Sequence, residues 1–130
     1  MGGYFWGHPW QWNQEIVIQV EEPGHALNQP VFEKSEYRFP EEIYQFQDPY
    51  SRGKVRVLVS LNEAKSDEPR GKVRREDGDF PISWIHEYGR SHIFYTALGH
   101  REDIYTNPVI LKHYLAGIQY ALRDLKASDE

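Results

Sequence analysis

The 130-residue sequence contains no cysteine, which excludes disulfide bonds and metal sites built from thiolates. No apolar run approaches the roughly 20 residues that a membrane-spanning helix needs, and no charged segment followed by an apolar one indicates a signal peptide. The formal net charge is −5, so the basic surface that a nucleic-acid backbone requires is also lacking. We therefore expect a soluble protein that binds neither nucleic acid nor membrane, and the compartment, cytoplasmic or exported, stays open.

Short motifs that identify common catalytic and nucleotide-binding sites are absent as well. There is no P-loop, no G-x-G-x-x-G fingerprint and no G-x-S-x-G nucleophile elbow. The six histidines are His8, His25, His86, His92, His100 and His113. No two of them have the i, i+4 or i, i+2 spacing of local zinc motifs. The cofactor is therefore undetermined, and a divalent metal remains a candidate only if residues from distant loops assemble its site.

Aromatic residues, in contrast, are abundant. They make up 15% of the chain, with four Trp and nine Tyr. Tyr and Trp combine a large apolar face with a polar group, which suits sugar-binding clefts and protein interfaces, although many of them can equally belong to the core.

The pattern predicts one domain, residues 1–130, in which several strands precede a single strong helix. β-Branched residues and alternation predict strands at Glu15–Glu22, Lys54–Leu61, Phe80–Gly89 and His92–Leu98. The intervening segments are a turn-rich connection at Pro23–Pro30, a short strand or single helical turn at Phe39–Phe46, and an exposed loop at residues 62–79.

The predicted strands differ in how they are covered. Alternation in Lys54–Leu61 places Val55, Val57, Val59 and Leu61 on one face. The segment His92–Leu98 is nearly all apolar, which is expected of a strand covered on both faces. A tight turn at residues 89–91 makes the last two strands an antiparallel hairpin.

The helix is predicted from about Pro108 to Leu125, with Asn107 as its N-cap and Pro108 at the first helical position. The apolar residues that share one stripe are Leu111, Tyr114, Leu115, Ile118, Leu122 and Leu125. We expect this stripe to lie on one face of the sheet, with His113 on the polar side. The other face then needs a cover: the aromatic N-terminal segment, a partner chain or further residues.

The first candidate for chemistry is His100, which follows the predicted strand His92–Leu98 and is preceded by Gly99. Ligands of open α/β sheets bind beyond the carboxyl ends of strands. A glycine there allows a positive φ or a close backbone approach, and an imidazole serves as acid, base or metal ligand. The alternative is that His100 bonds a loop carbonyl and orders the turn.

Two further groups are candidates. His8 lies in "GHPW", with Trp6, Trp10 and Trp12 around it, and either contacts a sugar or belongs to an aromatic plug over the core. A carboxylate of the Glu41–Glu42 pair, close in sequence to Tyr44, is a potential general base, unless both glutamates are simply solvated.

Four segments in order, "GGYFWGHPW", "VEEPGHALNQP", "FPEEIYQF" and "DFPISWIHEYGRSHIFYTALGH" with the helix after it, resemble the trehalose-utilisation family, the ThuA-like domains. The resemblance extends from about Gly2 to Leu125. One departure is "GRSH" in place of a Gly-Lys-Gly-Arg-like turn. The other is length, since the family domain usually exceeds 200 residues and this chain resembles its C-terminal portion.

The resemblance implies an α/β fold with a flavodoxin-like, class I glutamine-amidotransferase-like and largely parallel sheet, present here in part and with one long C-terminal helix. It implies a role in disaccharide or keto-sugar metabolism, with proton transfer or metal-assisted chemistry on a sugar. His100, Glu42 and His8 correspond to its catalytic candidates. Trp10, Tyr44 and Trp84 are expected to hold the sugar ring.

Two other functions remain open at this point. One is a non-catalytic sugar-binding or protein-interaction module, and the other is an oligomerising fragment of a larger enzyme. Half of such a sheet leaves an apolar strand edge unpaired, so we expect a homo-oligomer or pairing with a missing N-terminal half.

Overall fold

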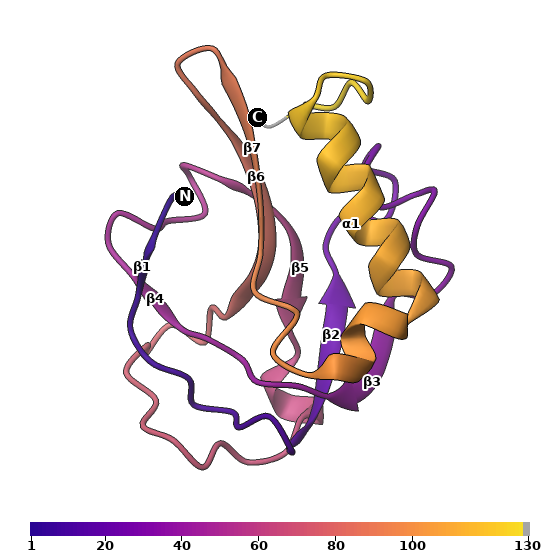
Figure 1. The fold of residues 1–130 in the computed structure, drawn as a ribbon. Coiled ribbons are helices and arrows are strands. Elements are labelled where there is room, and N and C mark those ends of the chain that lie inside the picture. Colours follow the sequence, from indigo (N-terminus) through magenta and orange to yellow (C-terminus); the bar gives the residue numbers. More distant parts are fainter. Residues whose placement is uncertain (129–130) are drawn as a thin grey trace.

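The computed structural model describes residues 1–128, which form a five-stranded sheet, a two-stranded sheet and one α-helix (Figure 1). In chain order the strands are β1 (Tyr4–Phe5), β2 (Glu15–Val20), β3 (Glu36–Pro40), β4 (Phe46–Gln47), β5 (Arg56–Leu61), β6 (Pro81–Tyr88) and β7 (Ser91–Thr96). The helices are the short 3-10 segments η1 (Glu63–Lys65) and η2 (Glu102–Thr106) and the α-helix α1 (Pro108–Ala121). No helix within residues 1–128 combines the length and apolar character needed to cross a bilayer.

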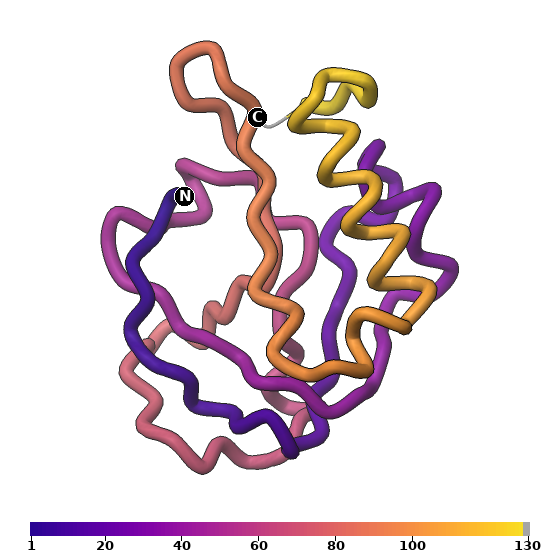
Figure 2. The backbone as a smooth tube through the Cα atoms, viewed as in Figure 1, coloured from indigo at the N-terminus to yellow at the C-terminus, as the bar shows by residue number. Residues whose placement is uncertain are grey.

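The larger sheet has the strand order β3-β2-β5-β6-β7, and all four of its pairings are antiparallel. The parallel sheet expected from the family resemblance is therefore not found in residues 1–128. The chain's connections explain this: a two-residue turn links β6 to β7, whereas parallel neighbours need a long crossover. The predicted hairpin is confirmed, and Figure 2 shows it extending beyond the rest of the backbone.

Strand β7 is an edge strand of this sheet, and the prediction of a strand covered on both faces holds in part, since Phe94 packs against the larger core cluster and Tyr95 against the smaller one. It pairs only with β6 among the described residues, and five of its six residues are half-buried. The predicted segment Phe39–Phe46 also differs. Strand β3 begins earlier, at Glu36, and the chain after it makes only an isolated bridge between Ile43 and Trp10 before β4.

The alternation predicted for β5 is broken by a bulge. The register of β5 against β6 shifts between Val57 and Val59 and again at Ser60. Leu58 and Val59 consequently both join the larger core cluster, whereas Val57 joins the smaller one. Because β5 is covered on both faces, the sequence pattern did not reveal the bulge.

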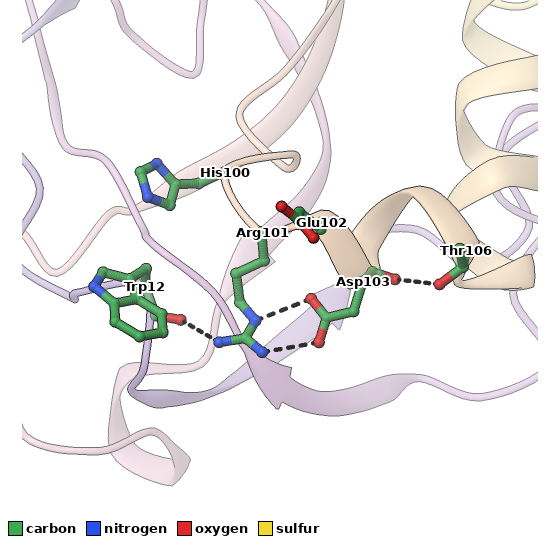
Figure 3. Close-up of a pocket in the computed structure, with 6 residues that line it drawn as sticks. All are labelled: Trp12, His100, Arg101, Glu102, Asp103 and Thr106. Carbon is green, nitrogen blue, oxygen red and sulfur yellow. Dashed lines mark hydrogen bonds and ion pairs between the residues drawn. The ribbon is translucent and has the colours of Figure 1, made fainter.

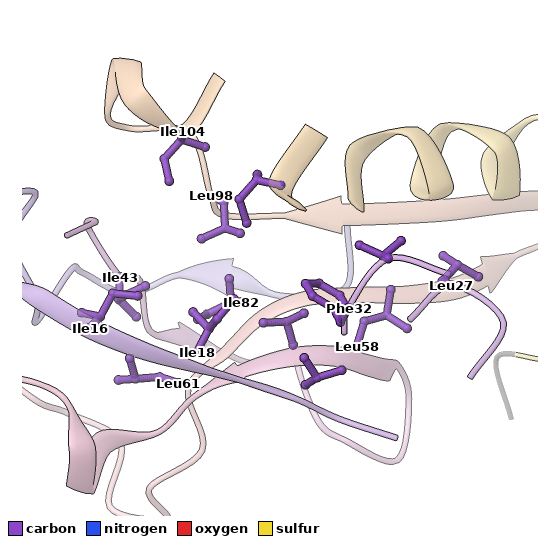
Figure 4. Packing of buried hydrophobic residues seen from close by; sticks show 14 of the residues in the cluster. Ile16, Ile18, Leu27, Phe32, Ile43, Leu58, Leu61, Ile82, Leu98 and Ile104 are labelled. Atoms are coloured by element: carbon purple, nitrogen blue, oxygen red, sulfur yellow. The ribbon is translucent and has the colours of Figure 1, made fainter. Parts of the chain in front are cut away.

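Two apolar clusters lie on opposite faces of the sheet. The larger contains the isoleucines and leucines of the central strands and the inner side of α1, as Figure 4 shows for the part around Ile18, Ile82 and Leu98. The smaller is aromatic, with Phe46, Tyr50 and Trp84. Figure 1 places β1 and β4 on the side of the sheet away from α1. The aromatic N-terminal segment and the β4 region thus provide the second cover.

The helix begins as predicted but faces the opposite way. Asn107 is its N-cap, and its side chain accepts bonds from the amides of Val109 and Ile110. The helix ends at Ala121 rather than near Leu125. Its buried residues are Ile110, His113, Ala116, Gly117 and Tyr120, whereas the exposed ones include Leu111, Leu115 and Ile118, and Leu122 at the C-cap is exposed too.

Shape explains this orientation. An added Cβ at Gly117 would lie 2.3 Å from the Phe94 ring, so a residue without a side chain lets α1 approach β7 closely. His113, predicted on the polar side, is fully buried and bonds Ser83. Apolar residues occur on nearly every side of α1, so periodicity alone did not identify the buried one.

Candidate functional site

The centre of the candidate site is the Glu42 carboxylate, which lies between two imidazoles. Its Oε1 is 3.6 Å from His100 Nδ1, and its Oε2 is 3.9 Å from His8 Nδ1. The Glu42 side chain is only 10% exposed, while those of His8 and His100 are 43% and 45% exposed. Segments about 30 to 90 residues apart in the chain, which belong to no common element, thus meet at one carboxylate.

Two aromatic rings line the same cluster. Phe5 stacks on His8 with ring centroids 6.2 Å apart and meets Tyr44 edge to face at 5.1 Å. Burial raises the pKa of Tyr44, and the charge and hydrogen bond of Glu42 raise it further. Tyr44 therefore keeps its proton near neutral pH as a donor beside Glu42. Four residues that the sequence singled out as candidates, His8, Glu42, Tyr44 and His100, thus lie together.

Glu41, the neighbour of Glu42, holds two segments of the site together through its buried carboxylate. It is fully buried, and its carboxylate accepts bonds from the amides of Glu42 at 2.8 Å and Gly99 at 3.1 Å. Burial raises the pKa of Glu41, although these amide bonds oppose the shift. These two hydrogen bonds connect the Glu42 segment directly to the turn that carries His100.

Gly99 has the role that its position predicted. Its φ is +128°, and a Cβ there would lie 2.6 Å from the hydroxyl of Tyr105, which donates to the Gly99 carbonyl. A residue with a side chain would be strained at this φ and would clash with the tyrosine. The chain consequently turns sharply after Leu98 and directs His100 to Glu42.

A depression of about 600 Å³ opens beside His100. Its lining residues are Trp12, His100, Arg101, Glu102, Asp103 and Thr106, shown in Figure 3. Arg101 bonds both carboxylate oxygens of Asp103 and the Trp12 carbonyl, and its guanidinium lies 5.7 Å from the Trp12 ring centre. The half-exposed indole and the polar groups around it form the kind of surface on which a sugar stacks and hydrogen-bonds.

Two predicted binding residues are corrected. Trp10 and Trp84 are fully buried, and their indole N–H groups donate to the carbonyls of Asp67 and Met1. Neither ring is accessible to a sugar, because Trp10 packs on Phe80 in the larger core and Trp84 belongs to the aromatic one.

Phe5 and Arg101 are parts of the site that the sequence did not single out, and Trp12 was considered only as one of the indoles around His8. Phe5 lies within "YFWGH", three residues before His8, and Arg101 directly follows His100. Proximity to the two histidines was the available signal. Within residues 1–128 no group of three or more His, Asp and Glu side chains is arranged to hold a metal ion.

A model of the ThuA family, described as trehalose utilisation, matches residues 1–121. A putative ThuA-like protein from Bacteroides uniformis is structurally similar, with a TM-score of 0.69 and 21% identity over 96% of this chain and 49% of its own. Another from Parabacteroides merdae has a TM-score of 0.57 and 16% identity over 99% of this chain and 50% of its own. No curated protein is similar enough to match.

These similarities confirm the predicted fold class, an α/β fold of the ThuA-like kind with one C-terminal helix. The chain spans about half the length of the two solved structures.

Proposed function

The chain belongs to the ThuA family, described as trehalose utilisation, and from this premise we propose that it binds a sugar beside His100 and transfers a proton on it. The observation that carries the proposal is the nearly buried Glu42 carboxylate with half-exposed imidazoles within 4 Å on two sides. The accessible edges of His8 and His100 face solvent, so a ligand can reach them.

The depression beside His100 supports the binding part of this proposal. Trp12, 52% exposed, offers an apolar face for the C–H groups of a pyranose. Arg101 and Asp103 are already bonded to each other, and their remaining donor and acceptor capacity suits hydroxyl groups. A disaccharide is the expected ligand class because the family is described as trehalose utilisation, and the depression of about 600 Å³ has the size of a small-molecule site.

The cluster supports chemistry at a carbon next to a carbonyl. In the proposed step Glu42 takes the proton from that carbon, and the C–H electron pair forms the C=C bond of an enediol. A protonated imidazole of His100 or His8 gives its proton to the carbonyl oxygen. The imidazole then takes the hydroxyl proton on the first carbon, whose oxygen becomes the new carbonyl, and Glu42 returns its proton to the former carbonyl carbon. This completes the isomerisation of an α-hydroxy carbonyl, so no oxidant or reductant is consumed.

A second candidate function is sugar binding without turnover. It is favoured by Trp12 and Arg101, which form a stacked pair at the depression without any group that must change its protonation state. The two candidates differ in whether Glu42 is required beyond binding.

Deuterium exchange distinguishes them. We expect the protein, incubated with keto-disaccharides in D2O, to exchange the hydrogen next to the carbonyl, as followed by NMR. Glu42→Gln keeps the shape of the side chain but removes the base, and should slow exchange by about 10²-fold or more. His86→Gln, a histidine outside the cluster, is the matched control and should exchange at the wild-type rate.

Thermal unfolding with a panel of disaccharides measures binding separately. Stabilisation that disappears in Trp12→Ala, without any deuterium exchange, would establish the binding module instead. Exchange that is the same in wild type and Glu42→Gln would refute the catalytic role of the cluster.

A further inference from the structure

The two imidazoles beside Glu42 have different surroundings, because Gln11 contacts only one of them. The side-chain nitrogen Nε2 of Gln11 lies 3.1 Å from the backbone carbonyl oxygen of His8 and 3.2 Å from its ring nitrogen Nδ1. A carbonyl oxygen only accepts hydrogen bonds, so the end of Gln11 that faces it is the NH2 group. The second hydrogen of that group is available to Nδ1, which accepts it. In the neutral ring of His8 the proton consequently lies on the other nitrogen, Nε2.

A buried residue holds the backbone of Gln11 in place. The Gln11 N–H donates to the side-chain oxygen of Gln14 at 2.9 Å, and the Gln14 N–H donates back to the Gln11 carbonyl at 2.9 Å. Gln14 is only 2% exposed, and its side-chain NH2 group donates to the Glu68 carbonyl. The Gln11 side chain therefore starts from a fixed backbone position when it reaches back to His8.

The contact with Gln11 determines what His8 can do beside Glu42. The Glu42 Oε2 atom is 3.9 Å from the same Nδ1 that accepts from Gln11. Because the lone pair of Nδ1 is engaged, this nitrogen has no proton to give to the carboxylate. Adding one would place two donors, the ring N–H and the Gln11 NH2 group, against each other. The arrangement therefore suits the neutral form of His8 and opposes the charged one.

His100 is placed differently. Its Nδ1 faces Glu42 Oε1 at 3.6 Å, and no hydrogen-bond donor of residues 1–128 lies against that nitrogen. A proton on Nδ1 therefore points to a carboxylate, which is the favourable partner for a charged imidazole. The ring also lines the depression beside Trp12 and is 45% exposed. Its second nitrogen, Nε2, is then the one that can give a proton to a ligand.

We propose that Gln11 is a positioning residue that fixes His8 as the neutral tautomer protonated on Nε2, and that the two imidazoles consequently have different roles. His8 donates its Nε2–H to an oxygen of the sugar and stays neutral. His100 gives its proton to the carbonyl oxygen and then takes the proton of the neighbouring hydroxyl. The roles rest on the proton transfer proposed above, whereas the tautomer of His8 does not depend on it.

Nitrogen-15 NMR of the full 130-residue chain tests the tautomer without any sugar. In mildly alkaline buffer, where imidazoles are generally neutral, the shifts of the two ring nitrogens show which one carries the proton. The His8 signals, assigned by their absence in His8→Gln, should show the proton on Nε2. Gln11→Met keeps the length of the side chain without its donor, so the proton should shift toward Nδ1, which still faces Glu42.

Gln29→Met is the matched control, because it makes the same change at an exposed glutamine outside the cluster, and it should leave the His8 signals unchanged. Far-UV circular dichroism of each variant verifies that it is folded. A wild-type His8 ring protonated on Nδ1 overturns the proposal, and so does a tautomer that Gln11→Met leaves unchanged.

Deuterium exchange over a range of keto-disaccharide concentrations tests the two roles. His100→Gln should lower the exchange rate at saturating sugar by about 10²-fold, because the proton donor is lost. His8→Gln should mainly raise the concentration needed for half-maximal exchange, since a contact to the sugar is weakened. An equal loss at saturation in both variants contradicts separate roles. If wild type exchanges no deuterium, the proposed proton transfer and the role of His100 fail together, while the nitrogen spectrum still decides the tautomer of His8.

Discussion

His113 lies in the interior between α1 and the sheet, away from the Glu42 cluster. Its Nε2 is 2.8 Å from the Ser83 hydroxyl, which donates to the Tyr95 carbonyl, and its ring contacts Phe94. Burial lowers the pKa of His113 to about 4, because the charged imidazole has no carboxylate partner there. The residue is thus a neutral part of the core at neutral pH.

We predict that His113 makes the protein less stable in mild acid. Its pKa is about 6.5 when unfolded and about 4 when folded, so below pH 6.5 the unfolded chain binds the proton more readily. The contribution of His113 to the free energy of unfolding is therefore greatest above pH 6.5, and it decreases by about 3 kcal/mol as the pH falls to 4. Urea unfolding at several pH values measures this.

His113→Gln is the comparison protein for this measurement, since glutamine does not titrate. Glu41 acts in the opposite direction, because burial raises its pKa. The difference between wild type and His113→Gln therefore isolates the histidine. Parallel curves for the two proteins between pH 6.5 and 4 would contradict the assignment.

At the scale of elements, the contact between α1 and β7 depends on a glycine in the middle of the helix. Gly117 lies against the ring of Phe94, and α1 contacts β7 more extensively than any other strand. A glycine within a helix usually costs about 1 kcal/mol relative to alanine. The close approach of the helix to the sheet offsets that cost.

We predict that Gly117→Ala lowers the thermal unfolding midpoint, although the same change stabilises most helices. The new Cβ would lie 2.3 Å from the Phe94 ring, and overpacking costs about 1–3 kcal/mol. In a Phe94→Leu background, Gly117→Ala should lower the unfolding midpoint by less than it does in the wild type, since the smaller side chain at position 94 leaves room for the new Cβ. A higher midpoint for Gly117→Ala alone would show that the helix shifts freely.

At the scale of the whole molecule, the larger sheet separates two apolar cores that hold different segments in place. The larger core lies under α1, and the aromatic core holds the segment with Tyr44 against the opposite face. Phe46 is the centre of the aromatic core, with rings of Tyr50, Trp84 and Tyr95 within 6.5 Å of its own. Strands β5 and β6 contribute to both cores, so the two should unfold together.

We predict that Phe46→Ala lowers the free energy of unfolding by about 3–5 kcal/mol, the usual cost of emptying a buried phenylalanine site. The near-UV signal of the aromatic residues and the far-UV signal of the helix should be lost at one common midpoint. Phe5→Ala is the control, because Phe5 is 52% exposed and its removal leaves no internal cavity. Two separate midpoints would show that the cores are independent.

The sequence by itself determined the features that depend on neighbouring residues. The N-cap at Asn107, the β6–β7 hairpin and the sharp turn at Gly99 follow from local rules for caps, turns and glycine. The family resemblance also selected His8, Glu42, Tyr44 and His100, which the structure brings together.

Only the tertiary structure decided which apolar surface is buried. Trp10 and Trp84 are core residues, and the Glu41 carboxylate accepts a bond from the Gly99 amide. The side of α1 that carries Leu111, Leu115 and Ile118 is exposed. Periodicity indicates which residues share a face, but it carries no information about which face finds a complementary surface. Where a helix is apolar on nearly every side, close packing determines which side is buried. The small residues Ala116 and Gly117 let one side of α1 approach β7, and Leu111 and Leu115 on the other side are exposed to solvent.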